Sequence, residues 1–383
     1  GLDGAALVAA ASAEPAKAAL RAATDAAVAA GLFGVPSFVV DNDRGKQLRR
    51  IDVLKAQNIA PDVVSTSTIR DKIAHTWEEL EKDLGENTFE NILYQMRLIY
   101  LKEKPQEDLL KEFENKIFKK RLISKGEKFT DEVFSYGNLY RSIFIDKDVI
   151  PEADLRHNKF RSLVHIMDQE FEASEWRACL LYFTRKFQGS YLYEFLLAIE
   201  KVYLEQWVTG TRKDERFGAY AKILKLIETA KGADDVVKAM TYEEVKIVKA
   251  LEAKNFYSLG YCKYFLLRLE ILASEHDTLR EFSAKSVEHV FPQKITVGSS
   301  WLSDPKIADH STYVNTVGNL VLLSKGKNSS ASNHDFAVKK EKYLKARVSD
   351  YPRSIQVLQE PNWTIQKIID RNDQIKTDIL KNP

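Results

Sequence analysis

The octet SVEHVFPQ, residues 286–293, places a histidine beside a carboxylate and three residues before a proline. It stands where helical periodicity ends, and Ser286 to Val290 is short enough to form one strand of a hairpin. A second apolar run, Asn319 to Leu323, follows a glycine and predicts the other strand. From Asn333 onward, apolar and basic residues recur at helical spacing. The predicted order is strand, long loop, strand, turn, helix.

That order supplies the residue types that hydrolysis of a phosphodiester needs. His289 on the first strand is a candidate general base, and Asn319 on the second strand is a candidate to hold its ring through a hydrogen bond. Glu288 and Asn328 offer oxygen ligands, which suit a hard cation such as Mg²⁺ or Mn²⁺. We therefore expect His289 and Asn319 to be catalytic and Glu288 and Asn328 to bind metal.

The same anchors resemble the carboxy-terminal HNH-type domain of GmrSD restriction proteins, whose pattern is E-H-I-x-P, then G-N-L-x-L-L, then N…S-N…F-x-x-K. The matching positions are Glu288, His289, Val290, Pro292, Gly318 to Leu323, Asn328, Ser332, Asn333, Phe336 and Lys339. The His-Asn-Asn arrangement also resembles the HNH domain of CRISPR effector nucleases. The resemblance implies a ββα-metal (His-Me finger) nuclease domain at 284–350. The broader HNH pattern commonly has aspartate before the histidine, so water-mediated ligation by Glu288 is an alternative to direct ligation.

Basic residues gather after the second strand. Lys325, Lys327, Lys339 and Lys340 are candidates to contact phosphates, which would give affinity for DNA without sequence preference. The alternative interpretation is a solvated helix face. Among the other histidines, His310 could contact phosphate or lie on a loop surface, and His334 could be an accessory ligand. We interpret His75, His157, His165 and His276 as structural.

The first 41 residues have a different composition from the rest. They are rich in alanine, and predict one helix at 14–31 and one strand at 33–41. They resemble the end of the thioredoxin-like fold of DsbA-type oxidoreductases and 2-hydroxychromene-2-carboxylate isomerases, with Val35-Pro36 at the bond that is cis in those families. No Cys-x-x-Cys precedes this bond, so we expect residues 1–41 to be an inert remnant.

Residues 42–59 resemble the last motif of the amino-terminal domain of GmrSD-type proteins. The pattern N-x-R-G…L…D-x-x-K is matched by Asn42, Arg44, Gly45, Leu48, Asp52 and Lys55. The D-G-Q-Q-R signature and nucleotide site of that domain would lie upstream, so we expect no useful binding of nucleoside triphosphates and a possible nucleotide-binding domain in a separate chain. A polar turn that caps an amphipathic helix is the alternative interpretation of the motif.

Residues 60–283 predict an array of helices, and 351–383 a helical tail. Apolar stripes at helical spacing run from Phe89 to Tyr100 and through 191–207, 217–230 and 261–272. Thr76-x-x-Glu79 and Thr241-x-x-Glu244 have the spacing of capping boxes. The expected fold class is mainly α, a helical array followed by the small ββα-metal domain.

The composition excludes several classes of protein. Lys and Arg total 57 against 55 Asp and Glu, so attraction to nucleic acid must come from local clusters. The two cysteines, Cys179 and Cys262, are too few for a disulfide framework or a Cys-x-x-Cys zinc site. The sequence shows neither a membrane span nor a signal peptide, which favours a cytoplasmic location.

The resulting hypothesis is a Mg²⁺-dependent DNA endonuclease similar to modification-dependent restriction enzymes, acting in defence on foreign DNA, with modified bases among its candidate targets. One alternative is a binding module that grips nucleic acid on a nuclease fold without cutting it. The other, a thiol oxidoreductase or isomerase, comes from residues 1–41 and lacks the active-site cysteines.

Overall fold

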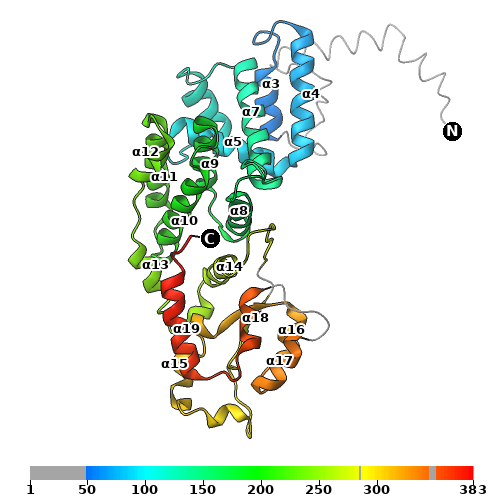
Figure 1. Ribbon diagram of the computed structural model, residues 1–383. Coiled ribbons are helices and arrows are strands. Elements are labelled where there is room, and N and C mark those ends of the chain that lie inside the picture. The colour runs from blue at the N-terminus through cyan, green and yellow to red at the C-terminus, as the bar shows by residue number, and fades with distance from the viewer. Residues whose placement is uncertain (1–48, 284–285, 345–350, 383) are drawn as a thin grey trace, which may run out of the picture. The chain divides into compact units, whose positions relative to one another are not determined.

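The computed structural model describes residues 49–283, 286–344 and 351–382 (Figure 1). The predicted remnant at 1–41 and the motif residues Asn42, Arg44, Gly45 and Leu48 lie outside the described residues. The described chain forms two compact units. The first comprises the described residues up to Leu101 together with Pro105–Asn138, and the second comprises Lys102–Lys104 and the chain from Leu139 onward.

The first unit is helical. Its elements are α3 (Arg50–Asn58), α4 (Ser67–Leu84), α5 (Glu86–Leu101), α6 (Leu109–Glu112), the π-helix η1 (Phe113–Phe118) and most of α7 (Glu127–Tyr140). α4 buries Ile73, Trp77, Leu80 and Leu84, which recur at three to four residues and therefore lie along one face. The Trp77 ring meets Phe89 of α5 edge to face at 5.1 Å between centroids, which joins the two helices.

Two residues of the 42–59 motif fall within α3: Asp52 caps its start, and Lys55 links it to α4. Asp52 accepts a hydrogen bond from the backbone N–H of Arg49, which precedes the first turn, at 3.3 Å. Lys55 pairs with Glu78 at 2.8 Å between Nζ and Oε1. These contacts agree with the interpretation of this part of the motif as a capped amphipathic helix.

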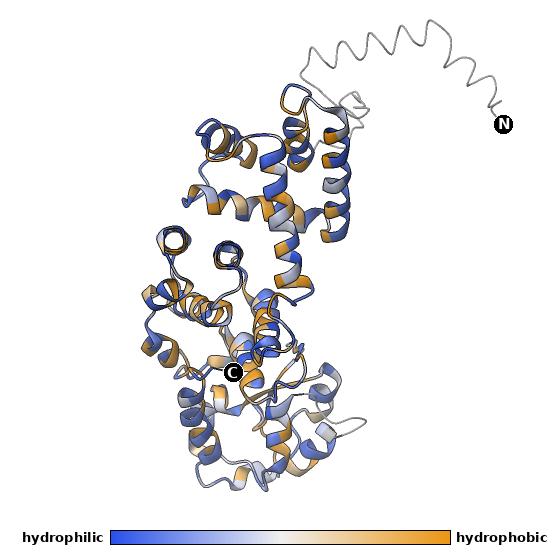
Figure 2. Cartoon of the chain, turned by 45° about the horizontal axis from the view of Figure 1, so that its top comes forward, coloured by the Kyte–Doolittle hydropathy of each residue, from blue (hydrophilic) through white to orange (hydrophobic). Residues whose placement is uncertain are grey.

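The helices of the second unit confirm the predicted stripes: 191–207, 217–230 and 261–272 coincide with α10, α11 and α14, as Phe89 to Tyr100 does with α5. The bounds are η2 (Arg141–Ile145), α8 (His157–Glu170), α9 (Glu175–Phe187), α10 (Leu192–Val208), α11 (Lys213–Thr229), α12 (Ala233–Ala239), α13 (Glu244–Ala250), η3 (Phe256–Ser258) and α14 (Cys262–Leu272). Figure 2 shows hydrophilic and hydrophobic residues alternating along these helices, as expected of amphipathic elements.

Both predicted capping boxes are wrong. Thr76 lies inside α4, which begins nine residues earlier, and α13 begins at Glu244 itself with Glu243 at its N-cap. A capping threonine must have non-helical backbone angles, so the spacing alone does not decide where a helix starts.

The predicted hairpin is present, with one correction. β1 (Ser286–His289) pairs antiparallel with β2 (Leu320–Leu323), with Glu288 opposite Val321 and His289 opposite Leu320. Asn319 does not begin the strand, because it ends a 3-10 turn, η6 (Val317–Asn319). The loop between the strands contains η4 (Ser300–Ser303), η5 (Ile307–Asp309) and α15 (His310–Tyr313).

Helices follow β2 and enclose the hairpin. They are α16 (Lys325–Ala331), in place of the predicted turn, α17 (Phe336–Leu344), α18 (Pro352–Gln359) and α19 (Ile365–Asp378). Val321 and Leu323 of β2 pack into a core with Phe291, Tyr343 and Trp363. Gly318 allows α19 to approach, because a Cβ there would clash with the Ile368 carbonyl oxygen. The described residues are thus mainly helical, with one two-stranded sheet among them.

Across the described ranges, no helix combines the length and the apolar character that crossing a membrane requires.

Candidate functional site

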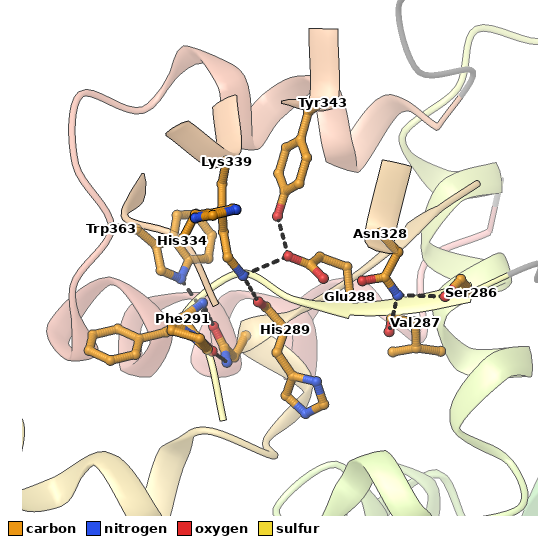
Figure 3. Close-up of polar contacts among 12 residues, drawn as sticks. Ser286, Val287, Glu288, His289, Phe291, Asn328, His334, Lys339, Tyr343 and Trp363 are labelled. Atoms are coloured by element: carbon orange, nitrogen blue, oxygen red, sulfur yellow. Dashed lines mark hydrogen bonds and ion pairs between the residues drawn. The ribbon is translucent and has the colours of Figure 1, made fainter. Parts of the chain in front are cut away.

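β1 presents its two candidate residues on opposite faces. Successive side chains of a strand point in opposite directions, so Ser286 and Glu288 share one face while Val287 and His289 share the other. Figure 3 shows the Glu288 carboxylate toward Tyr343 and Lys339, and the His289 ring pointing away from them. The predicted base and the predicted metal ligand therefore occupy different surroundings.

The His289 ring is held by a residue from the long loop. Its Nε2 lies 2.9 Å from Oδ1 of Asn315, and Gln293 donates to the same oxygen at 2.9 Å. An amide oxygen only accepts, so Nε2 carries the proton and Nδ1 bears the lone pair. Nδ1 has no hydrogen-bond partner among the described residues. The Tyr257 ring meets the imidazole edge to face at 4.5 Å between centroids.

Burial sets the charge of this histidine. His289 is 8% exposed. Loss of solvation lowers its pKa to about 4, the hydrogen bond with Asn315 opposes the shift, and the Lys339 charge adds to it. At neutral pH the ring is therefore a neutral imidazole, which is the form that accepts a proton.

Asn319 fixes the backbone around the strand ends and not the ring. Its Nδ2 donates to the carbonyl oxygens of Phe291 and Val314, both at 2.8 Å. Its Oδ1 accepts from the Phe291 N–H at 2.8 Å and from Nε1 of Trp363 at 3.1 Å. All four positions of the amide are taken, so the expected bond from Asn319 to His289 is replaced by the bond from Asn315.

Glu288 belongs to a buried cluster under α17. Its Oε1 accepts from Nζ of Lys339 and from the hydroxyl of Tyr343, each at 2.7 Å. Lys339 also donates to the His289 carbonyl oxygen at 2.6 Å. Burial raises the pKa of Glu288 and lowers that of Lys339, while their pairing opposes both shifts. Because Lys339 is fully buried, its predicted contact with nucleic acid is wrong.

Asn328 ties α16 to β1 on the Glu288 face. Its Nδ2 donates to Oγ of Ser286 at 2.5 Å and to the Val287 carbonyl oxygen at 3.0 Å. Figure 3 shows the side chains of Glu288 and Asn328 as neighbours above the strand. Neither Oε2 of Glu288 nor Oδ1 of Asn328 has a hydrogen-bond partner in the part of the chain that the structure describes. Two such oxygens fit the donor chemistry of a hard cation, which also takes water and phosphate oxygens.

A metal held by protein side chains alone finds less support. Groups of three or more histidine, cysteine, aspartate or glutamate side chains that could hold an ion are absent from the described ranges. A cation at Glu288 and Asn328 would thus need most of its ligands from solvent or substrate.

The remaining predicted residues lie nearby with different exposures. Lys325 is exposed at the start of α16, whereas Lys327 donates to the Tyr343 carbonyl oxygen. Lys340 donates to the Glu360 carbonyl oxygen at 2.8 Å. His310 contacts the Pro292 carbonyl oxygen at 2.9 Å, and His334 is exposed just before α17. Of the four predicted lysines, Lys325 offers the most accessible charge.

Residues 242–377 match the family model described as GmrSD restriction endonucleases, C-terminal domain. No curated protein matches the chain. The matched segment runs from just before α13 almost to the end of α19 and contains both faces of β1. The segment that carries His289, Glu288 and Asn328 is therefore similar to the C-terminal domains of GmrSD restriction endonucleases, and this similarity indicates a nuclease function of the restriction type.

Proposed function

We propose that this domain hydrolyses phosphodiester bonds of DNA in a metal-dependent reaction of the HNH type, with His289 as general base. The observation that carries the proposal is the state of that ring: a neutral imidazole with Nε2 bonded to Asn315 and Nδ1 without a partner among the described residues. The match to a restriction endonuclease domain makes DNA the expected substrate.

His289 would take a proton from the attacking water at Nδ1. The bond to Asn315 keeps the other nitrogen protonated, so a single tautomer faces the substrate. A pKa of about 4 makes the resting ring a weak base. The negative charge of a bound phosphodiester would favour the protonated ring and so raise this pKa toward neutrality, where proton transfer is more efficient.

Glu288 Oε2 and Asn328 Oδ1 would hold Mg²⁺ or Mn²⁺. A divalent cation bound there would neutralise charge on the scissile phosphate and its leaving oxygen. Lys339 shares the Glu288 carboxylate, so its positive charge weakens metal binding in the resting protein. Substrate phosphate would complete the ligand set and strengthen it.

A plasmid-nicking assay with Mg²⁺, with EDTA, and with His289→Ala tests this proposal. Loss of a general base should slow cleavage by ~10²–10⁴-fold while DNA affinity stays near the wild-type value. His75→Ala is the matched control, because that histidine is exposed on α4. Cleavage by His289→Ala at the wild-type rate, or cleavage unaffected by EDTA, would refute the corresponding part.

Asn328→Ala tests the proposed ligand set separately. The substitution should raise the Mg²⁺ concentration needed for half-maximal nicking, whereas Ser330→Ala on the exposed side of α16 should not. An unchanged Mg²⁺ titration would remove Asn328 from the ligand set.

A non-cleaving module is the second candidate, and the Lys339–Glu288 pair favours it. The Lys339 ammonium already supplies the positive charge that a metal would bring to the Glu288 carboxylate. Salt-sensitive DNA binding without metal-dependent nicking would establish this alternative.

The wider role remains part of the proposal. We place the activity in the cytoplasm, in defence against foreign DNA with modified bases among the candidate targets. A nucleotide-binding domain in a separate chain is the candidate partner. Comparing nicking of plasmids with and without base modification tests the choice of target.

A further inference from the structure

A pocket of about 570 Å³ lies within the second unit, where helical elements meet the hairpin. Trp207 of α10 and Tyr257 of η3 supply aromatic walls, and Glu170 and Lys263 supply charges. Val287 of β1 and Asn328 of α16 close the side that belongs to the candidate site. The pocket therefore shares a wall with the proposed nuclease centre.

Tyr257 connects the pocket to the His289 ring. The start of β1 borders the pocket through both Ser286, on the Glu288 face, and Val287, on the His289 face. Tyr257 also lines the pocket while its ring contacts His289, and its N–H donates to the Asn315 carbonyl oxygen at 3.1 Å. A ligand in the pocket would thus lie beside the residues that hold the reactive ring.

The lining has the chemistry of a site for a flat, polar ring. Trp207 and Tyr257 offer surfaces for stacking. Glu170 is half-buried at the end of α8, and its carboxylate has no hydrogen-bond partner among the described residues. Burial raises its pKa, and the Lys263 charge opposes the shift. A half-buried carboxylate of this kind is stabilised by a ligand that donates to it.

We propose that this pocket receives one unstacked nucleobase of the DNA substrate, and that Glu170 selects bases with an exocyclic amine. Its volume is in the range of small-ligand sites, large enough for one nucleotide and too small for a duplex. A carboxylate accepts from the amine of cytosine, adenine or guanine, whereas thymine has no such group. Extruding the base would also bring its phosphate toward His289. The inference rests on the proposed function for one point only, that the substrate is DNA.

Gly260 provides a way to fill the pocket without straining the backbone. It lines the pocket, and a Cβ there would meet Nε1 of Trp207 at 3.9 Å, an ordinary contact. Gly260→Leu should therefore occupy the pocket with apolar atoms. Gly218→Leu on α11 is the matched control, because a Cβ at that position has no atom within 4 Å.

Saturation-transfer NMR of the full chain with the four deoxynucleoside 5′-monophosphates, in EDTA, tests binding without cleavage. We expect transfer to the base protons of dCMP, dAMP and dGMP to exceed that to dTMP severalfold. Gly260→Leu should abolish the transfer, Gly218→Leu should preserve it, and Glu170→Gln should reduce the preference against dTMP. Absent transfer in the wild type, or equal transfer with Gly260→Leu, overturns the proposal.

Cleavage then separates this inference from the proposed function. Gly260→Leu should slow plasmid nicking by roughly 10- to 100-fold, the change expected when one stacked base is lost. It should slow hydrolysis of bis(p-nitrophenyl) phosphate, which has no base, far less than it slows plasmid nicking. If Gly260→Leu nicks plasmid at the wild-type rate, the nucleobase proposal is refuted and the proposed hydrolysis is not affected. If the wild type hydrolyses neither substrate yet binds the nucleotides as expected, the proposed hydrolysis fails and the pocket stands.

Discussion

The two faces of β1 differ in what surrounds adjacent residues of the chain. On one face Glu288 is enclosed by Lys339 and Tyr343, with Oε1 bonded to both. On the other face His289 has one nitrogen bonded to Asn315 and the other without a described partner. Glu288 thus chiefly anchors α17 to β1, whereas His289 keeps its basic Nδ1 available.

The side chain of Lys339 contacts both residues. Lys339 pairs with the Glu288 carboxylate and also donates to the His289 carbonyl oxygen, so it fixes the backbone between them. The anchored face thereby gives the reactive face its rigid support.

Removing Lys339 should have the largest effect on stability. Lys339→Ala leaves the Glu288 charge buried without its partner, which typically lowers the free energy of unfolding by about 3–5 kcal/mol. Urea unfolding followed by circular dichroism measures the change. Lys325→Ala on the exposed start of α16 should stay within about 0.5 kcal/mol of the wild type.

A double variant shows whether Lys339→Ala lowers stability through the unpaired Glu288 charge or through lost packing. Glu288→Leu combined with Lys339→Met removes both charges, and such replacements are often neutral or stabilising. We expect it to recover most of the stability that Lys339→Ala loses. A double variant less stable than Lys339→Ala would show that packing, not charge, governs this face.

Sequence patterns predicted the strands and named candidate site residues, but they did not predict the contacts of those residues. The end of helical periodicity and a short apolar run after Gly318 predicted β1 and β2, and helical spacing predicted α17 because burial of one helix face imposes that period. The position of Asn315 could not be predicted in this way, because it lies in a long loop without periodicity. Gln293 stood within the opening octet, yet its contact with Asn315 depends on how that loop folds back. The burial of Lys339 was equally hidden, since lysines at helical spacing usually face solvent.

The depressed pKa of His289 predicts a dependence of stability on pH. The folded value is about 4 against an ordinary 6.5, so the unfolded chain binds the proton first as pH falls. The contribution of neutral His289 to the free energy of unfolding is complete above pH 6.5 and is lost as pH falls toward 4. Between pH 7 and 4.5 the wild type should lose roughly 2–3 kcal/mol more than His289→Gln.

Chemical denaturation at several pH values measures this difference. His75→Gln should follow the wild-type curve, because His75 is exposed on α4. Parallel curves for the wild type and His289→Gln would contradict the lowered pKa.

Asn315 should control catalysis more than stability. Asn315→Ala frees the ring to adopt either tautomer, and the loss of such an orienting partner typically costs ~10–100-fold in activity. Asn315→Asp retains an acceptor and adds a negative charge, which raises the pKa of His289. The acid limb of the pH–rate profile of nicking should therefore move to higher pH in Asn315→Asp. An unmoved limb would exclude His289 as the titrating base.

Tyr343→Phe should have the smallest effect on stability, and it tests directly whether the two faces of β1 act independently. The substitution removes one donor from Glu288 Oε1 but keeps the ring in the core and leaves the bond from Lys339 in place. A hydrogen bond to a charged group contributes about 1.5 kcal/mol at the low end, so the midpoint of urea unfolding should fall modestly. Tyr191→Phe, at an exposed tyrosine, should not change it. Because Tyr343 lies on the anchored face, the Michaelis constant and pH profile of nicking should remain those of the wild type. A shifted pH profile would mean that the Glu288 face titrates together with His289, and the two faces would then form one coupled site.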